Sequence, residues 1–88
     1  MQADVPLTAS AILAEAVALM SIYAHFESQS GTILTARMLL AVGNRRRISP
    51  DALQRGLNYS RMIGWIEMHS SGGLKLTPSG FYVMKRFL

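Results

Sequence analysis

Side chains that can hydrogen-bond to DNA bases are spaced along one short stretch of the chain, PDALQRGLNYSRMIG, residues 50–64. The stretch carries Gln54, Arg55, Asn58 and Arg61. An arginine can donate two hydrogen bonds to the O6 and N7 atoms of guanine, and an asparagine or glutamine can pair with N6 and N7 of adenine. The same residue types also occupy many ordinary solvent-exposed helix faces. The residue types of this stretch are therefore compatible with base recognition, but they do not establish it.

Three consecutive arginines, Arg45, Arg46 and Arg47, precede this stretch. Such a cluster can bind the phosphates of a nucleic-acid backbone, which positions a protein on the duplex without reading its sequence. A triple arginine is also common in solvated turns. Phosphate binding is the prediction, and it places the three arginines on the same side of the fold as the base-reading side chains.

A single helix is expected to position the base-reading side chains. Ser49 can cap it with its hydroxyl, Pro50 suits the first helical position, and Asp51 suits the positive end of the helix dipole. Gly64 should end the helix after Ile63. On a helical projection the small and apolar side chains share one side, and the polar ones fill a separate arc of roughly 120°. The buried side would hold Ala52, Leu53, Gly56, Leu57, Ser60 and Ile63, and the polar arc Asp51, Gln54, Arg55, Asn58, Arg61 and Met62.

Two conditions attach to this hypothesis. Glu15 and Glu27 must not neutralise the guanidinium groups of the polar arc, and the rest of the chain must not cover them. Tyr59, at the border of the arc, can stack on a sugar or donate to a phosphate, although an aromatic ring at a helix margin more often seals the core.

Charge is unevenly distributed along the chain. The 88 residues carry a net charge of +4, but residues 1–36 have three acids and no base. Residues 37–88 have nine bases against two acids, a net charge of +7. Concentrated positive charge indicates a polyanionic partner. The other interpretation is a charged surface that only keeps the protein in solution.

Length and composition favour one globular domain, residues 1–88, because so short a chain cannot divide its core. The absence of cysteine excludes disulfides, thiolate zinc sites and a cysteine nucleophile. The opening MQADVPLTAS lacks the basic start of a signal peptide, so a cytoplasmic protein is expected. No phosphate-binding glycine loop, nucleophile motif or pair of carboxylates is present. We therefore expect neither an enzyme nor a cofactor or metal site.

The first 31 residues are expected to form an N-terminal helix that Thr8 or Ser10 caps and that runs to about Gln29. Its apolar side chains cover about half of the circumference, more than a helix of a small domain usually hides. Either the other helices wrap this face, or part of it forms a homodimer interface. The apolar run of residues 11–24 is too short to span a membrane.

A second helix should begin after Thr35 and end near Val42, closed by Gly43-Asn44. Residues 43–49 would then form a seven-residue connection to the next helix. After Gly64, the alternation of apolar and polar residues predicts a hairpin in WIEMHSSGGLKLT, residues 65–77.

Thr77-Pro78 should start the last helix. Residues 32–88 would thus hold a helix-turn-helix, a hairpin and a C-terminal helix. The predicted fold class is mainly α with a short β-hairpin, in the order helix, helix, helix, hairpin, helix.

This order resembles a winged helix-turn-helix domain, and two stretches carry the resemblance. ISPDALQRGLNYSRMIGWIEM is similar to the region in which an isoleucine-serine pair opens the recognition helix and a glycine leads into the wing. LKLTPSG is similar to the return strand of the wing and the Leu-Thr-x-x-Gly opening of the last helix in MarR-like regulators. The resemblance implies that residues 50–63 lie in the major groove of double-stranded DNA and that the wing offers Lys75 and His69. The seven-residue connection departs from the shorter turn of the simplest helix-turn-helix.

The leading hypothesis is therefore a small DNA-binding transcriptional regulator, a homodimer through its N-terminal helix. Its nucleic-acid-binding residues would be Arg45, Arg46, Arg47, Gln54, Arg55, Asn58, Tyr59, Arg61 and Lys75. The alternative is a winged-helix protein-protein interaction module that does not bind nucleic acid, with Met62 as its clearest exposed apolar residue. A third possibility is an RNA-binding protein or a fragment of a longer protein.

Overall fold

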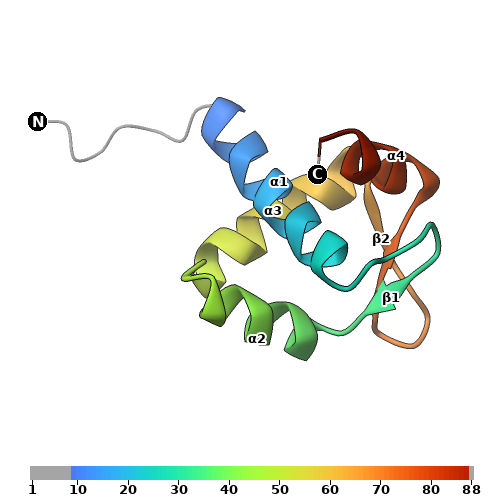
Figure 1. Ribbon diagram of the computed structural model, residues 1–88, viewed down its shortest axis with the longest axis horizontal. Coiled ribbons are helices and arrows are strands. Elements are labelled where there is room, and N and C mark those ends of the chain that lie inside the picture. Colours follow the sequence, from blue (N-terminus) through green and yellow to red (C-terminus); the bar gives the residue numbers. More distant parts are fainter. Residues whose placement is uncertain (1–8, 88) are drawn as a thin grey trace, which may run out of the picture.

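The computed structural model describes residues 9–87 of the chain (Figure 1). Within them, four helices and three short strands follow one another as α1 (Ala9–His25), β1 (Ile33–Leu34), α2 (Ala36–Arg45), α3 (Pro50–Met62), β2 (Ile66–Met68), β3 (Leu74–Leu76) and α4 (Pro78–Phe87). The prediction of a mainly helical chain with a short hairpin before the last helix is confirmed. Thr8, one candidate cap of the first helix, lies outside the described residues, and Ser10 lies within α1 rather than before it.

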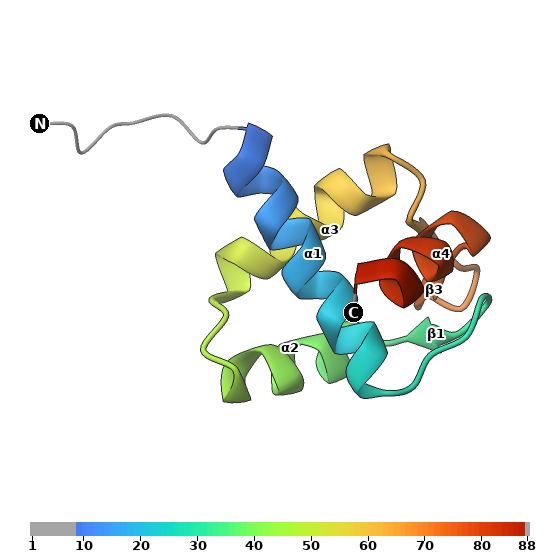
Figure 2. The ribbon, with the colours of Figure 1, turned by 45° about the horizontal axis from the view of Figure 1, so that its top comes forward.

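α1 is the central element of the fold. It crosses α3 and also contacts α2 and α4 (Figures 1 and 2). Five of its side chains have no solvent-exposed surface, namely Ala16, Leu19, Met20, Ile22 and Tyr23. Of the two expectations for the wide apolar face of this helix, wrapping by the other helices thus accounts for residues 16–23. Leu13, nearer the start of α1, is 42% exposed.

A glycine brings α3 into backbone contact with α1. A Cβ atom at Gly56 would lie 2.5 Å from the carbonyl oxygen of Glu15, closer than such atoms approach one another in proteins. α3 can pack this tightly only because residue 56 has no side chain. Gly43 allows a similar approach between α2 and α3, where a Cβ atom would lie 2.5 Å from Cδ1 of Leu53.

Two residues beyond the last residue of α1 and of α2, a residue other than glycine adopts the left-handed backbone conformation. Glu27 has a φ of 53° and Arg47 a φ of 60°. At the end of α2, the amide of Ile48 donates a 2.8 Å hydrogen bond to the carbonyl oxygen of Gly43. This bond is typical of the Schellman motif, whose left-handed position glycine usually occupies.

These helix ends correct three predictions. α1 ends at His25 rather than near Gln29, and α2 continues through Gly43-Asn44 to Arg45. Only residues 46–49 connect α2 to α3, so the expected seven-residue connection is also wrong. The sequence favours glycine as a helix end, whereas the chain uses Glu27 and Arg47, and Gly43 serves helix packing instead.

The three strands form an antiparallel sheet in the order β1-β3-β2. β2 and β3 are the predicted hairpin, in which Glu67 lies opposite Lys75. β1 is not expected from the sequence, because its two residues, Ile33 and Leu34, are too few to show an alternating pattern. They become a strand through pairing with β3, far along the chain.

Thr77 starts α4, as predicted. Its hydroxyl oxygen accepts a 3.0 Å hydrogen bond from the amide of Gly80, within the first turn. The same hydroxyl donates to the carbonyl oxygen of Gly64 at 2.5 Å, directly after α3. One side chain therefore both begins α4 and fixes it to the end of α3.

Tyr23 is expected to make the fold less stable at alkaline pH. Its phenol is fully buried and donates a 2.7 Å hydrogen bond to the carbonyl oxygen of Leu74, and this burial raises the pKa of Tyr23 well above its ordinary value. The unfolded chain loses the proton near pH 10, whereas the folded chain retains it. The free energy of unfolding is therefore expected to fall above about pH 10, by up to about 1.4 kcal/mol per pH unit for this residue.

Urea unfolding curves measured from about pH 8 to pH 11 test this expectation. Tyr23→Phe should lose this part of the pH dependence and should cost about 1 kcal/mol at neutral pH, because one buried hydrogen bond is removed. Tyr82→Phe is the control, since the side chain of Tyr82 is 63% exposed. A Tyr23→Phe variant with the alkaline slope of the wild type would contradict the prediction.

Candidate nucleic-acid interface

α3 begins at Pro50, as the sequence predicts, and ends at Met62, one residue before the predicted end. The hydroxyl of Ser49 accepts a 3.1 Å hydrogen bond from the amide of Ala52, and Pro50 occupies the first turn. Gly64 has a φ of 84° just beyond the last turn. Of the predicted buried side, Leu53, Gly56 and Ser60 are buried, Ala52 and Leu57 are partly buried, and Ile63 is exposed. Ile63 follows the last helical residue, Met62, which places it at the edge of the packed side.

Two amide side chains of the polar arc are hydrogen-bonded to each other. Nε2 of Gln54 donates to Oδ1 of Asn58 at 3.0 Å, across one turn of α3. Both side chains are exposed. The bond leaves Oε1 of Gln54 as an acceptor and Nδ2 of Asn58 as a donor. The edge of adenine offers the complementary pair, a donor at N6 and an acceptor at N7.

Arg55 is held by an acid on α1. Its guanidinium binds the carboxylate of Glu15 side-on, with Nε 2.9 Å from Oε1 and Nη2 2.6 Å from Oε2. Hydrogen bonding from Arg55 lowers the pKa of the Glu15 carboxyl, and the same bonds raise the pKa of Arg55. The expectation that this guanidinium is free is wrong, because Glu15 occupies two of its donor groups.

Arg61 is the free cation of the polar arc. It is exposed and, among residues 9–87, has no hydrogen-bond or ion-pair partner. It lies beside an open hollow between α3 and β2, which is lined by Asn58, Arg61, Met62, Ile66, Glu67 and Met68. Met62 is 74% exposed and Met68 is 50% exposed. The hollow thus combines a guanidinium, an amide, a carboxylate and two thioether side chains.

Tyr59 lies at the border of the polar arc, close to Arg55 and Asn58. It is partly buried and lines a second shallow hollow together with Ile12 of α1 and Met62. Within residues 9–87, Tyr59 is not among the partly buried side chains that pack against the hydrophobic core. Its hydroxyl has no hydrogen-bond partner within the described part of the chain, so it remains able to donate to a phosphate.

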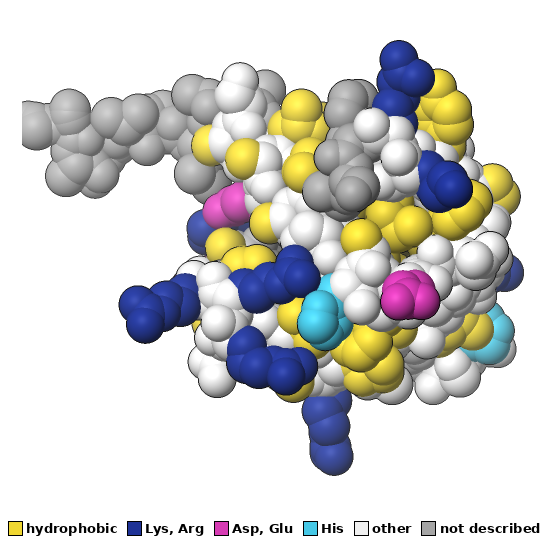
Figure 3. Space-filling model, viewed as in Figure 1, with side chains coloured by type: hydrophobic (Ala, Val, Ile, Leu, Met, Phe, Trp, Pro, Cys, Tyr) yellow, Lys and Arg dark blue, Asp and Glu magenta, His cyan; other side chains and the backbone are white. Residues whose placement is uncertain are grey.

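The three consecutive arginines lie at the end of α2 and in the turn to α3. Figure 3 shows Lys and Arg side chains gathered over this end of the molecule. Arg46 donates to Oγ of Ser21 at 2.9 Å, and its Nη2 lies 3.4 Å from Nδ1 of His25, so it extends along α1 rather than toward the polar arc. The expectation that all three share the side of the arc is therefore wrong for Arg46. Arg45 and Arg47 are exposed, and their guanidinium groups have no partner among the described residues.

Lys75 lies in β3, the central strand of the sheet. Its Nζ is 3.6 Å from Oε2 of Glu67 on the neighbouring strand. Glu67, directly opposite Lys75 on β2, therefore offsets part of its positive charge. At the tip of the hairpin, the ring of His69 contacts the hydroxyl of Ser71 at 2.9 Å. Of the elements in the candidate interface, the hairpin therefore offers the least support for nucleic-acid binding.

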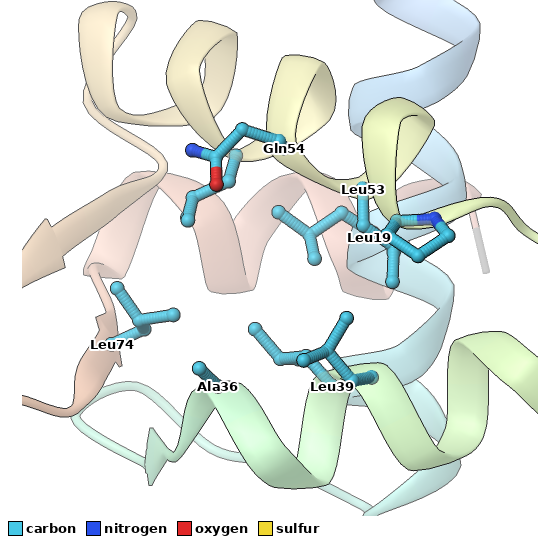
Figure 4. Close-up of a pocket in the computed structure, with 9 residues that line it drawn as sticks. Leu19, Ala36, Leu39, Leu53, Gln54 and Leu74 are labelled. Atoms are coloured by element: carbon cyan, nitrogen blue, oxygen red, sulfur yellow. The ribbon is translucent and has the colours of Figure 1, made fainter.

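An apolar pocket that the sequence does not indicate lies between α2, α3 and β3 (Figure 4). Its volume is about 90 Å³, and its lining consists of Leu19, Ala36, Leu39, Leu40, Pro50, Leu53, Gln54, Leu57 and Leu74. Gln54 is the one polar side chain in this lining. Ligand sites for small molecules usually measure about 300 Å³ or more. The pocket is therefore a gap in the packing of α2 against α3 rather than a ligand site.

Comparison of the chain with models of protein families, with curated proteins and with solved structures finds no match in any of the three. No helix in residues 9–87 is long and apolar enough to cross a membrane. In the same residues no group of three His, Asp or Glu side chains is placed to hold a metal ion. The structure thus defines a small, mainly helical domain with a three-stranded antiparallel sheet and with free cations on α3 and in the turn before it.

Proposed function

We propose that the protein is a small DNA-binding transcriptional regulator in which α3 lies in the major groove. The observation that supports this most is the outward face of α3, where Gln54, Asn58 and Arg61 are exposed and no acid is paired with them. A free guanidinium suits guanine, and the amide pair suits adenine. Arg45 and Arg47, in front of α3, would bind backbone phosphates.

The order and spacing of the elements add support. α2, the turn of residues 46–49 and α3 are followed by an antiparallel sheet, which is the arrangement that the resemblance to a winged helix-turn-helix domain implies. The connection is as short as in the simplest helix-turn-helix. We also propose a cytoplasmic homodimer, for which the exposed Leu13 marks the part of α1 that a second copy would cover.

The test is the binding of duplex DNA as a function of salt. A preferred site is first selected from random duplexes, and its affinity is then measured by fluorescence anisotropy. Arg61→Gln is expected to weaken binding to the preferred site by roughly 1–3 kcal/mol, because a free guanidinium of the outward face is lost. Arg86→Gln is the control with the same charge change on α4.

Two outcomes would overturn the proposal. One is a wild-type protein that does not bind duplex DNA at low salt, where phosphate contacts are strongest. The other is equal weakening by Arg61→Gln and Arg86→Gln, which would mean that only the total charge matters. Thermal melts of both variants establish that the fold is retained.

A second candidate function is a protein-protein interaction module. The observation that favours it is the exposure of Met62 and Met68 on either side of the hollow between α3 and β2. Methionines adapt their shape to varied apolar partners, which makes them common on protein-binding surfaces. Failure to bind a heparin column at moderate salt, together with loss of a protein complex on Met62→Lys, would favour this function over DNA binding.

A further inference from the structure

The polar arc of α3 has one cation that the chain itself neutralises. The side-chain exposure of Arg55 is 42%, which leaves it within reach of an approaching ligand. The Glu15 side chain that binds it is only 17% exposed, because it lies in the seam between α1 and α3. Two charge-assisted hydrogen bonds hold the pair together.

The backbone fixes the position of this acid. Gly56, next to Arg55, packs against the carbonyl oxygen of Glu15 with no room for a Cβ atom. The backbone of Glu15 is therefore fixed against α3, next to Arg55, and its carboxylate reaches the guanidinium from there. Hydrogen bonding from Arg55 keeps the pKa of the Glu15 carboxyl below its ordinary value, so the carboxylate is charged at neutral pH.

Arg55 lies on the border of the polar arc that faces α1, where the backbone of a DNA duplex would pass if α3 entered the groove. A free arginine at such a border would bind phosphate. Asp51, one turn earlier on α3, adds a second negative charge that favours the charged form of Arg55. In the free protein, the donors that would meet a phosphate are turned to Glu15.

We infer that Glu15 is an internal competitor of DNA, which holds Arg55 out of phosphate contact and keeps the affinity of the protein below what its cations would otherwise give. This inference rests on the proposed function. It makes Glu15 a positioning residue, since it acts on DNA only through Arg55. The ligand class that it opposes is the phosphodiester backbone.

The test compares Glu15→Gln with Glu27→Gln, which removes the same charge from an exposed residue that has no ion-pair partner among the described residues. Glu15→Gln should raise the affinity for a duplex at low salt on the order of fivefold and should steepen the slope of log K against log salt by about 0.9, the value for one added phosphate contact. Glu27→Gln should leave the slope unchanged. A purely structural role of Glu15 would not steepen it.

The double variant Glu15→Gln with Arg55→Gln provides a second measurement. It removes the pair without changing the net charge, so wild-type affinity and salt slope are expected. Equal effects of Glu15→Gln and Glu27→Gln would overturn the inference. So would a double variant with a flatter slope than the wild type, because Arg55 would then contact phosphate while it is paired. The double variant can therefore overturn the inference even if Glu15→Gln alone does not fold.

These outcomes are separate from a failure of the proposed function. If the wild-type protein binds no duplex, DNA binding itself is wrong and the inference falls with it. If the wild-type protein binds with a steep salt dependence but the Glu15→Gln slope is unchanged, only the role of Glu15 is wrong.

Discussion

Replacing Gly56 by alanine is expected to lower the free energy of unfolding by about 2 kcal/mol. The added Cβ atom would lie 2.5 Å from a backbone oxygen of α1, which cannot rotate away as a side chain can. α3 must therefore shift as a whole, which disturbs the largest helix contact in the fold. Alanine favours a helix over glycine by about 1 kcal/mol, and this gain offsets part of the cost.

Thermal unfolding followed by circular dichroism measures this effect, and a fall in the melting temperature of roughly 10 °C is expected. Gly43→Ala is the matched comparison, because it is also a buried helical glycine but its added Cβ atom meets Cδ1 of Leu53. That methyl group can move into the neighbouring apolar pocket, whose lining includes Leu53. If Gly56→Ala is no less stable than Gly43→Ala, the tight seam between α1 and α3 does not exist in solution.

Replacing the arginine cluster is expected to have the largest effect on DNA binding. The variant Arg45→Ala, Arg46→Ala, Arg47→Gly should reduce the affinity for all duplexes by roughly tenfold or more at low salt. It should flatten the slope of log K against log salt by about two units rather than three, because Arg46 is bound to α1 and only two arginines are free. Glycine is chosen at position 47 because its φ of 60° suits glycine better than alanine.

The control variant removes three other exposed cations, Arg37, Lys85 and Arg86, by changing each to alanine. It carries the same change in net charge on α2 and α4. Its affinity for DNA should fall less, and its salt slope should stay close to that of the wild type. Equal slopes for the two variants would show that the cluster has no special contact with phosphate.

The sequence predicts those parts of the fold that depend on neighbouring residues. Ser49-Pro50-Asp51 starts α3 and Gly64 ends it, because capping and the left-handed turn involve only a few consecutive positions. The alternation of residues in β2 and β3 and the start of α4 at Thr77 are local features in the same sense. These predictions agree with the structure.

The remaining features depend on contacts between residues that are distant in the sequence. Arg55 and Glu15 are 40 positions apart, and no pattern in either helix indicates that they meet. The one available signal is that Glu15 is the only acid in an otherwise apolar run, which suggests a buried or paired carboxylate. The pairing of β1 with β3 and the attachment of Arg46 to Ser21 likewise require the folded chain.

The central position of α1 has a consequence for biosynthesis. α1 leaves the ribosome before α2, α3 and α4, yet the side chains of its middle are covered only when those later helices have been made. During translation its leucine and methionine face therefore has no native neighbour to shield it, and a nascent apolar helix in this state is prone to self-association or capture by chaperones. Folding of this domain is thus a late event in its synthesis, completed when α3 closes over the helix made first.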